Sequence, residues 1–266
     1  MGEATNRSDA PAKLGTFLGV FTPSVLTILG VILFLRLGWV VGQVGLAGAI
    51  GIVLIAHLIT IATALSVSAV ATNMRVGAGG AYYIISRSLG LEIGGAIGVP
   101  LFLAQTFSVT LYAFGLAETL QLLWPDIPMR ATAALTVLAV SLIAGRGANL
   151  AMQLQLPILA AIVLALISFF IGVPGRALDA VPLWRGIEGG EGFWTVFAVF
   201  FPAVTGLMAG VSLSGDLRNP NRSIPKGTLI AVGVGLVVYL AVPVALAVTS
   251  TPEALASDNL IWFGIA

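Results

Sequence analysis

Two apolar stretches of this 266-residue chain contain residues that an ordinary membrane-spanning helix does not need. The first, Leu26–Ile32, carries a threonine and a glycine and follows Pro23; the second, Phe201–Met208, carries a proline, a threonine and a glycine. Because backbone amides and carbonyls in lipid must be hydrogen-bonded, Pro and Gly within one span indicate a helix break that faces protein or water. The carbonyl end of a broken helix favours cations, and the amide end favours anions. We therefore interpret the two stretches as two halves of one ion site.

Arg36 and Glu118 are ionisable residues inside the expected spans. Such residues are costly in a membrane, are usually paired and often have a function. Both are expected near the outer end of their helices, at matching depth and with opposite charge. The sequence therefore predicts either a gate that opens and closes, a static ion pair, or two side chains that extend separately to the interface.

Other polar residues give no sign of an enzyme, because no Ser–His–Asp set, metal cluster or pair of catalytic carboxylates stands out. Arg75–Gly80 is glycine-rich but lacks the Lys-Ser/Thr of a phosphate loop, so it is interpreted as a cytoplasmic turn. His57 has no companion ligand and is interpreted as a core histidine with its hydrogen bonds satisfied. Solvation and topology explain the charged loop Asp216–Lys226. We predict no enzyme and no cofactor.

The composition predicts an all-α polytopic membrane protein, since 58% of residues are hydrophobic and 9% are charged, against about 25% charged in soluble domains. A net charge of +1 argues against a nucleic-acid partner. Residues 1–13 are polar, lack the pattern of a signal peptide and are expected to form a disordered cytoplasmic tail. Residues 14–266 are expected to form the transmembrane domain.

About seven runs are apolar and long enough to cross a bilayer, although the fourth is short and the third is long enough to tilt. They are Phe17–Val41, Leu46–Thr72, Ile93–Leu123, Ala131–Ala144, Leu150–Gly172, Phe193–Leu213 and Gly227–Val248. Basic residues concentrate in the loops on the N-terminal side, which predicts a cytoplasmic N-terminus. These residues are Arg7, Lys13, Arg75, Arg87, Arg146, Arg218, Arg222 and Lys226, against Arg130, Arg176 and Arg185 on the other side.

The first and sixth spans share a Pro, a following Thr and a later Gly. Transporters built from inverted repeats place broken helices at corresponding positions of their two halves. A five-plus-five design would put the first repeat at residues 14–172 and the start of the second at residues 192–266. One repeat and two further spans are not expected to transport alone. The alternative is that Pro and Gly are simply common in membrane helices.

Several segments resemble the electroneutral cation–chloride cotransporters of the amino acid–polyamine–organocation superfamily. They are LTILGVILFLRLGWVVGQ, ALSVSAVATN, GAGGAYYIISRSLG, LYAFGLAETL and FAVFFPAVTGLMAGVSLSGDLRNPNRSIPKGTL. The resemblance covers nearly all of Leu14–Leu229 and suggests a bacterial-type short or truncated member. It implies a broken-helix fold of two inverted five-helix repeats.

The resemblance implies a potassium site that consists of neutral oxygens, which suit this cation. Its residues would be Thr27, Ile28, Tyr112, Pro202 and Thr205. Thr27 stands where relatives usually carry Asn, a difference that a backbone-carbonyl ligand tolerates. The alternative for Tyr112 is an aromatic core residue whose hydroxyl is bonded elsewhere.

The resemblance also implies two chloride sites made of backbone amides, at Gly30, Val31 and Ile32 and at Gly206, Leu207 and Met208. A partial sodium site would involve Leu26 and Leu29, together with spans not contained in this chain. The family carries the Arg36–Glu118 pair as an outer gate.

The expected function is a secondary active symporter that couples chloride to potassium, sodium or both. Alternatives are an amino acid or polyamine permease of the same superfamily, whose broken helices would bind a carboxylate and an ammonium, and a truncated, non-transporting membrane partner. The expected partners are chloride, alkali cations and the lipid bilayer, and a homodimer is one possible assembly. The expected location is the plasma or inner membrane, with multiple spans.

Overall fold

The computed structural model of the protein describes residues 13–74, 76–146, 148–175 and 184–266. Most residues in these ranges are helical, and Leu14 and Leu217 form an isolated parallel bridge. The expected disordered tail lies outside the described residues except for Lys13. Three basic residues on which the predicted topology depends, Arg7, Arg75 and Arg176, also lie outside them.

The first span is interrupted where its sequence predicts a break. The π-helical turn η1 (Phe17–Phe21) leads into α1 (Thr22–Ile28), and α2 (Val31–Leu35) follows two residues later. A second interruption at Arg36, with φ −124° and ψ −20°, separates α2 from α3 and was not predicted.

The helix α3 (Leu37–Asn73) contains the outer end of the first span and all of the second, with a kink between them. Gly45 forms this kink with φ 67° and ψ 176°. A Cβ atom at Gly45 would lie within 3 Å of the backbone of Trp184 and Arg185, so both the dihedral angle and the space require glycine.

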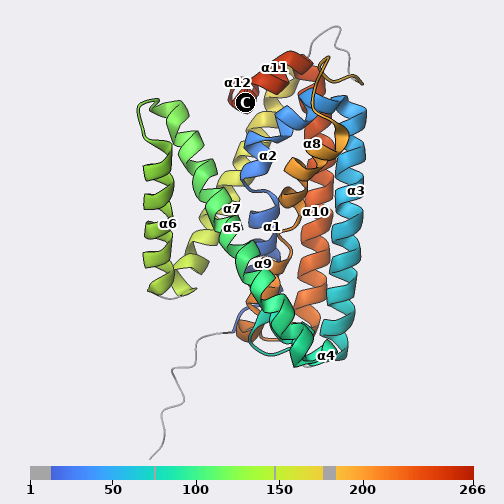
Figure 1. Ribbon diagram of the computed structural model, residues 1–266, viewed down its shortest axis with the longest axis vertical. Helices are drawn as coiled ribbons and strands as arrows, with labels where there is room; N and C mark the ends of the chain where they lie inside the picture. Colours follow the sequence, from blue (N-terminus) through green and yellow to red (C-terminus); the bar gives the residue numbers. More distant parts are fainter. Residues whose placement is uncertain (1–12, 75, 147, 176–183) are drawn as a thin grey trace, which may run out of the picture.

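The middle of the chain forms four α-helices and a short 3₁₀ turn. These are α4 (Gly80–Leu89), α5 (Leu91–Leu123), α6 (Met129–Gly145), α7 (Ala148–Gly172) and η2 (Val173–Gly175). The sequence analysis did not predict α4. Figure 1 shows α5 crossing the molecule obliquely, with α6 packed on its far side.

The sixth span is also interrupted. It consists of α8 (Phe193–Phe200), the 3₁₀ turn η3 (Phe201–Val204) and, after a short irregular segment, α9 (Met208–Ser212). The remaining elements are η4 (Ser214–Asp216), α10 (Pro220–Thr249), α11 (Pro252–Ser257) and α12 (Ile261–Ile265).

The core forms where α10 packs along α3, with α1 and α8 beside them (Figure 1). Leu33, Leu37, Ile52, Tyr239 and Leu246 are all fully buried there. In contrast, large apolar residues of α5, α6 and α7 are exposed, as expected of side chains that contact lipid. Among the described residues, six helical segments are long and apolar enough to cross a membrane, and α6 is a shorter apolar helix. The chain is therefore a multi-pass membrane protein, and its division into repeats remains a prediction.

Candidate functional site

The break in the first span exposes both kinds of backbone group. α1 ends at Ile28, Leu29 has φ −87° and ψ 40°, and Gly30 is extended before α2 begins. The last carbonyls of α1 and the first amides of α2 have no partner within their own helix. The first break therefore places helix-end carbonyls and helix-start amides only a few residues apart.

The break in the sixth span is held against the first by hydroxyl groups. The Thr27 Oγ1 atom donates to the Gly206 carbonyl at 2.8 Å, and also lies 2.9 Å from the carbonyls of Pro23 and Ser24. Ser24 Oγ donates to the Leu207 carbonyl at 3.3 Å. A Cβ atom on Gly206 would collide with Thr27, so this contact requires glycine.

A third hydroxyl, Thr60 Oγ1 of α3, donates to the Val204 carbonyl at 3.3 Å and to its own helix at Ala56. Hydroxyls of α1 and α3 therefore bond three carbonyls around the second break: Val204, Gly206 and Leu207. These bonds satisfy backbone groups that lipid could not satisfy.

A narrow pocket, with no space for a water-sized sphere, lies between the first break, Tyr112 of α5 and the start of η3. It is lined by Thr27, Ile28, Gly30, Val31, Ile32, Tyr112, Pro202 and Ala203. The pocket thus brings together four of the five predicted potassium residues and all three residues of the first predicted chloride site. None of the lining residues is ionisable at neutral pH.

The remaining predicted residues lie outside this lining. Thr205 is exposed, and its hydroxyl donates to the Pro202 carbonyl at 2.8 Å. The second predicted chloride site, at Gly206, Leu207 and Met208, begins α9 beside the first break. Of the two predicted sodium residues, Leu29 is buried and Leu26 is partly buried.

Tyr112 stands at the edge of the pocket with an uncommitted hydroxyl. A Cβ atom on Gly30 would lie 3.5 Å from the Tyr112 ring, which is an ordinary van der Waals distance, so the ring does not require glycine at this position. Among the described residues, the Tyr112 hydroxyl makes no hydrogen bond. This favours the interpretation as a ligand over that of a core aromatic bonded elsewhere.

Tyr239 of α10 is a site residue that the sequence analysis missed. Its hydroxyl donates to the Ile28 carbonyl at 2.7 Å, and its side chain is fully buried. Its ring packs edge-on against Phe200 and lies 5.9 Å from the ring of His57. A lone tyrosine in an apolar run was the only signal for this role.

His57 is buried, as expected for a core histidine, but only one of its ring nitrogens has a partner. Nδ1 lies 2.9 Å from the Val53 carbonyl. Nε2 has no partner among the described residues. The expectation of a fully satisfied histidine therefore holds for one nitrogen only.

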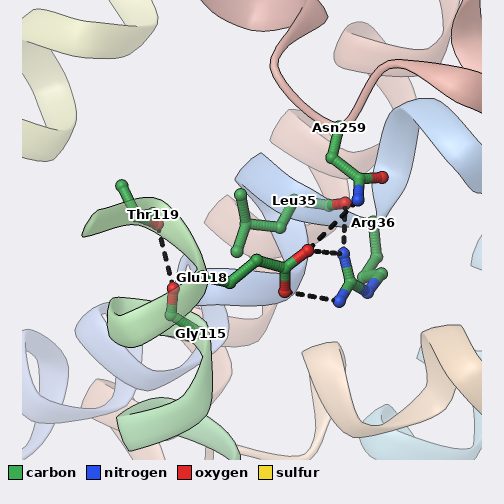
Figure 2. Close-up of polar contacts among 6 residues, drawn as sticks. All are labelled: Leu35, Arg36, Gly115, Glu118, Thr119 and Asn259. Atoms are coloured by element: carbon green, nitrogen blue, oxygen red, sulfur yellow. Dashed lines mark hydrogen bonds and ion pairs between the residues drawn. The ribbon is translucent and has the colours of Figure 1, made fainter. Parts of the chain in front are cut away.

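Arg36 and Glu118 form a bidentate ion pair, as Figure 2 shows. Arg36 Nη1 donates to Glu118 Oε1 at 2.9 Å, and Nη2 donates to Oε2 at 2.6 Å. Asn259, which precedes α12, adds a bond from Nδ2 to Glu118 Oε1 at 3.1 Å. The two charged side chains remain 35% and 20% exposed, so water reaches the pair.

The ion pair lines a second cavity next to the pocket. This cavity is lined by Arg36 and Glu118 and also by Val31 and Ile32, which line the pocket. Three hydrogen bonds to Glu118 join the side chains there. The role of the pair as an outer gate stays a prediction.

The chain is a multi-pass helical protein, and its two interrupted spans meet beside a pocket of neutral groups. This is the architecture of a broken-helix secondary transporter. The family model described as amino acid permease matches residues 19–262, and the chain belongs to that family. Permeases are transport proteins, which agrees with the prediction that the chain is not an enzyme.

The chain is similar to members of solute carrier family 12. It is 36% identical to mouse solute carrier family 12 member 1 over 271 residues, which is 93% of this chain and 25% of the relative. It is 37% identical to human solute carrier family 12 member 2 over 266 residues, which is 91% of this chain and 22% of the relative. The chain therefore spans about a quarter of the length of these relatives. The similarity agrees with the resemblance to cation–chloride cotransporters.

Proposed function

We propose that the chain forms the ion-binding part of a secondary active symporter that couples chloride to potassium, sodium or both. The observation that carries this proposal is the pocket in which the first break, Tyr112 and the start of η3 meet. Its Ile28 and Pro202 carbonyls and Tyr112 hydroxyl are neutral oxygens, which replace the hydration shell of an alkali cation without a fixed counter-charge. The amides of Gly30, Val31 and Ile32 would bind chloride beside the cation.

A second candidate, an amino acid permease, is favoured by the description of the family model. The narrowness of the pocket argues for the ion. Pockets for organic ligands measure roughly 300–1,000 Å³, whereas in this structure the pocket has no space for even a water-sized sphere, so it would have to open much further for an amino acid than for an alkali ion. It also offers no ionisable side chain to pair with an amino acid's ammonium or carboxylate group.

The two candidates make different predictions for ligand binding by the purified chain, because a ligand that binds only the folded state raises the melting temperature. We expect potassium chloride to raise it more than choline chloride or potassium gluconate at equal ionic strength. A panel of amino acids should have no effect. The symporter proposal fails if amino acids stabilise the chain while potassium chloride acts no more strongly than choline chloride.

Transport itself is tested in liposomes by comparing chloride-dependent uptake of rubidium with uptake of the amino acid panel. Rubidium uptake that requires chloride would support the symporter, and amino acid uptake would support the permease. If the chain binds potassium chloride but takes up neither rubidium nor amino acids, it binds ions without transporting them on its own, as expected of a partner protein. The proposed orientation places the N-terminus in the cytoplasm.

A further inference from the structure

A cavity of about 640 Å³ opens between the segment that precedes α4 and the segment that leads into α10. Figure 1 shows α4 at the end of the molecule away from α11. Three cationic side chains, Lys13, Arg218 and Arg222, line the cavity. All of the lining residues are described, and none of them is acidic. This combination of space and one-sided charge is separate from the pocket between the helix breaks.

The backbone holds two of these cations side by side. In the parallel bridge, the Leu14 amide donates to the Asp216 carbonyl at 2.8 Å, and the Arg218 amide donates to the Leu14 carbonyl at 2.9 Å. Lys13 and Arg218 directly adjoin the two bridged residues. Their backbones are therefore fixed beside each other, and their like charges gain nothing from that proximity.

The opposite wall is also held by specific bonds. Ser214 Oγ donates to the Gly77 carbonyl at 2.8 Å and accepts from the Gly80 amide at 3.3 Å. Asn221 Nδ2 donates to the Met74 carbonyl at 3.1 Å. Asn219 lines the cavity, and its side chain makes no capping bond to α10. The cavity is thus a built site with polar donors left over.

The cations of the cavity have no carboxylate partner in the part of the chain that the structure describes, where the ion pair found is that of Arg36 with Glu118. An anion placed among the three side chains would relieve their mutual repulsion and accept their hydrogen bonds. Arginine guanidinium groups match the oxygens of a phosphate in particular, because they can bind two oxygens at once.

We propose that this cavity binds the phosphate group of an anionic phospholipid. It lies where the spans end, since η1 begins at Phe17, α3 ends at Asn73 and α10 begins at Pro220. Basic pockets between helix ends at a membrane surface bind lipid head groups in this way. Tyr83 of α4 lines the cavity, and the exposed apolar side chains of Leu89 and Leu91 stand at the other end of that helix. Solvation and topology alone do not explain why three cations share one built cavity.

Native mass spectrometry of the whole chain in detergent tests this proposal with three probes: phosphatidylglycerol, phosphatidylcholine and inorganic phosphate. The test variant combines Lys13→Gln, Arg218→Gln and Arg222→Gln. The control is Lys226→Gln. Lys226 lies on α10, as Arg222 does, but it does not line the cavity. Circular dichroism and melting temperature establish that each variant folds. If the triple variant does not fold, Arg222→Gln alone takes its place.

We expect phosphatidylglycerol to bind more tightly than phosphatidylcholine. Each charge removed from the cavity should lower the affinity for phosphatidylglycerol about fivefold, because a basic residue near an anionic membrane surface contributes about 1 kcal/mol. The affinity of the triple variant should therefore be about a hundredfold lower than that of the wild type. Lys226→Gln should retain most of the binding. If inorganic phosphate binds as tightly as phosphatidylglycerol, and the triple variant loses this binding, the cavity would be assigned to a soluble phosphate. Binding of phosphatidylglycerol that is the same in the triple variant and the wild type, or no binding of any probe, would overturn the proposal.

Discussion

Tyr112 is the residue that tests the cation site most directly, because its hydroxyl borders the pocket and is not committed to another group of the described chain. Tyr112→Phe keeps the ring that packs beside Gly30, so the fold should be retained. Loss of one bond to a charged partner, about 1.5–3 kcal/mol, should weaken apparent potassium affinity roughly ten- to a hundredfold. The measurement is the melting temperature as a function of potassium chloride concentration.

In the Tyr112→Phe variant, the apparent affinity for chloride should weaken together with that for potassium, because coupling between two bound ligands is reciprocal. Tyr239→Phe is the matched comparison: it also removes a tyrosine hydroxyl, but one that bonds the Ile28 carbonyl from the opposite side within the core. Tyr239→Phe should lower the free energy of unfolding and should have a smaller effect on the apparent affinity for ions. Unchanged potassium dependence in Tyr112→Phe would exclude Tyr112 as a ligand.

Thr27 has a structural role that differs from that of a side-chain ligand. Its hydroxyl bonds the Gly206 carbonyl and so joins the two breaks. Thr27→Val has nearly the same shape but cannot donate, and we expect it to lower the free energy of unfolding by about 1–2 kcal/mol. Thr27→Ser, which keeps the hydroxyl, should restore most of this loss. Chemical denaturation in detergent measures both variants, and equal stability of Val and wild type would argue against the bond.

At the scale of elements, the hydrogen bonds of Glu118 join three segments that are far apart in sequence: the junction of α2 and α3, helix α5 and the segment before α12. Glu118→Gln and Arg36→Gln should each destabilise the chain, and the double variant should cost less than the sum of the singles. Because both side chains are partly exposed, we expect a coupling free energy of about 1–2 kcal/mol, below the 3–5 kcal/mol of a dry pair.

Asn259→Ala extends this cycle, since it removes the third bond to Glu118 without removing a charge. Its effect should be about 0.5–1.5 kcal/mol, and it should be lost once Glu118 is replaced by Gln. Additive effects of all three substitutions would show that these side chains act independently.

The elements were only partly predictable from the sequence. Pro23 and Gly30 revealed the first break because both residues disfavour a continuous helix. The interruption at Arg36 gave no such signal, since arginine is a good helix former and its backbone geometry depends on tertiary contacts. The kink at Gly45 falls in the connection predicted between the first two spans, but the close contact with the backbone of Trp184, which requires glycine there, gave no signal in the sequence.

The site was predictable where the backbone itself supplies the groups, as at Ile28 and Gly30. It was not predictable where side chains distant in sequence bond these groups, as Thr60 and Tyr239 do. Such residues look like ordinary members of apolar helices. Their role becomes visible only when the packing of α3 and α10 against the breaks is known.

At the scale of the whole molecule, the absence of cysteine from the chain allows its orientation to be tested cleanly. Asp126→Cys lies between α5 and α6, and Arg146→Cys lies between α6 and α7; both positions are exposed. In intact cells, an impermeant maleimide should label the Asp126→Cys variant alone, and permeabilised cells should label both. The reverse pattern would invert the topology that the basic residues predict.

The lack of ionisable side chains around the pocket has a consequence for the response to membrane voltage. A cation bound there alone would add one elementary charge to the moving part of the protein, and each charge that crosses 100 mV changes the energy by about 2.3 kcal/mol. With chloride bound beside the cation, that charge is cancelled and the electric field does no net work. The loaded protein would then carry no current, and the driving force would come from the concentration gradients alone.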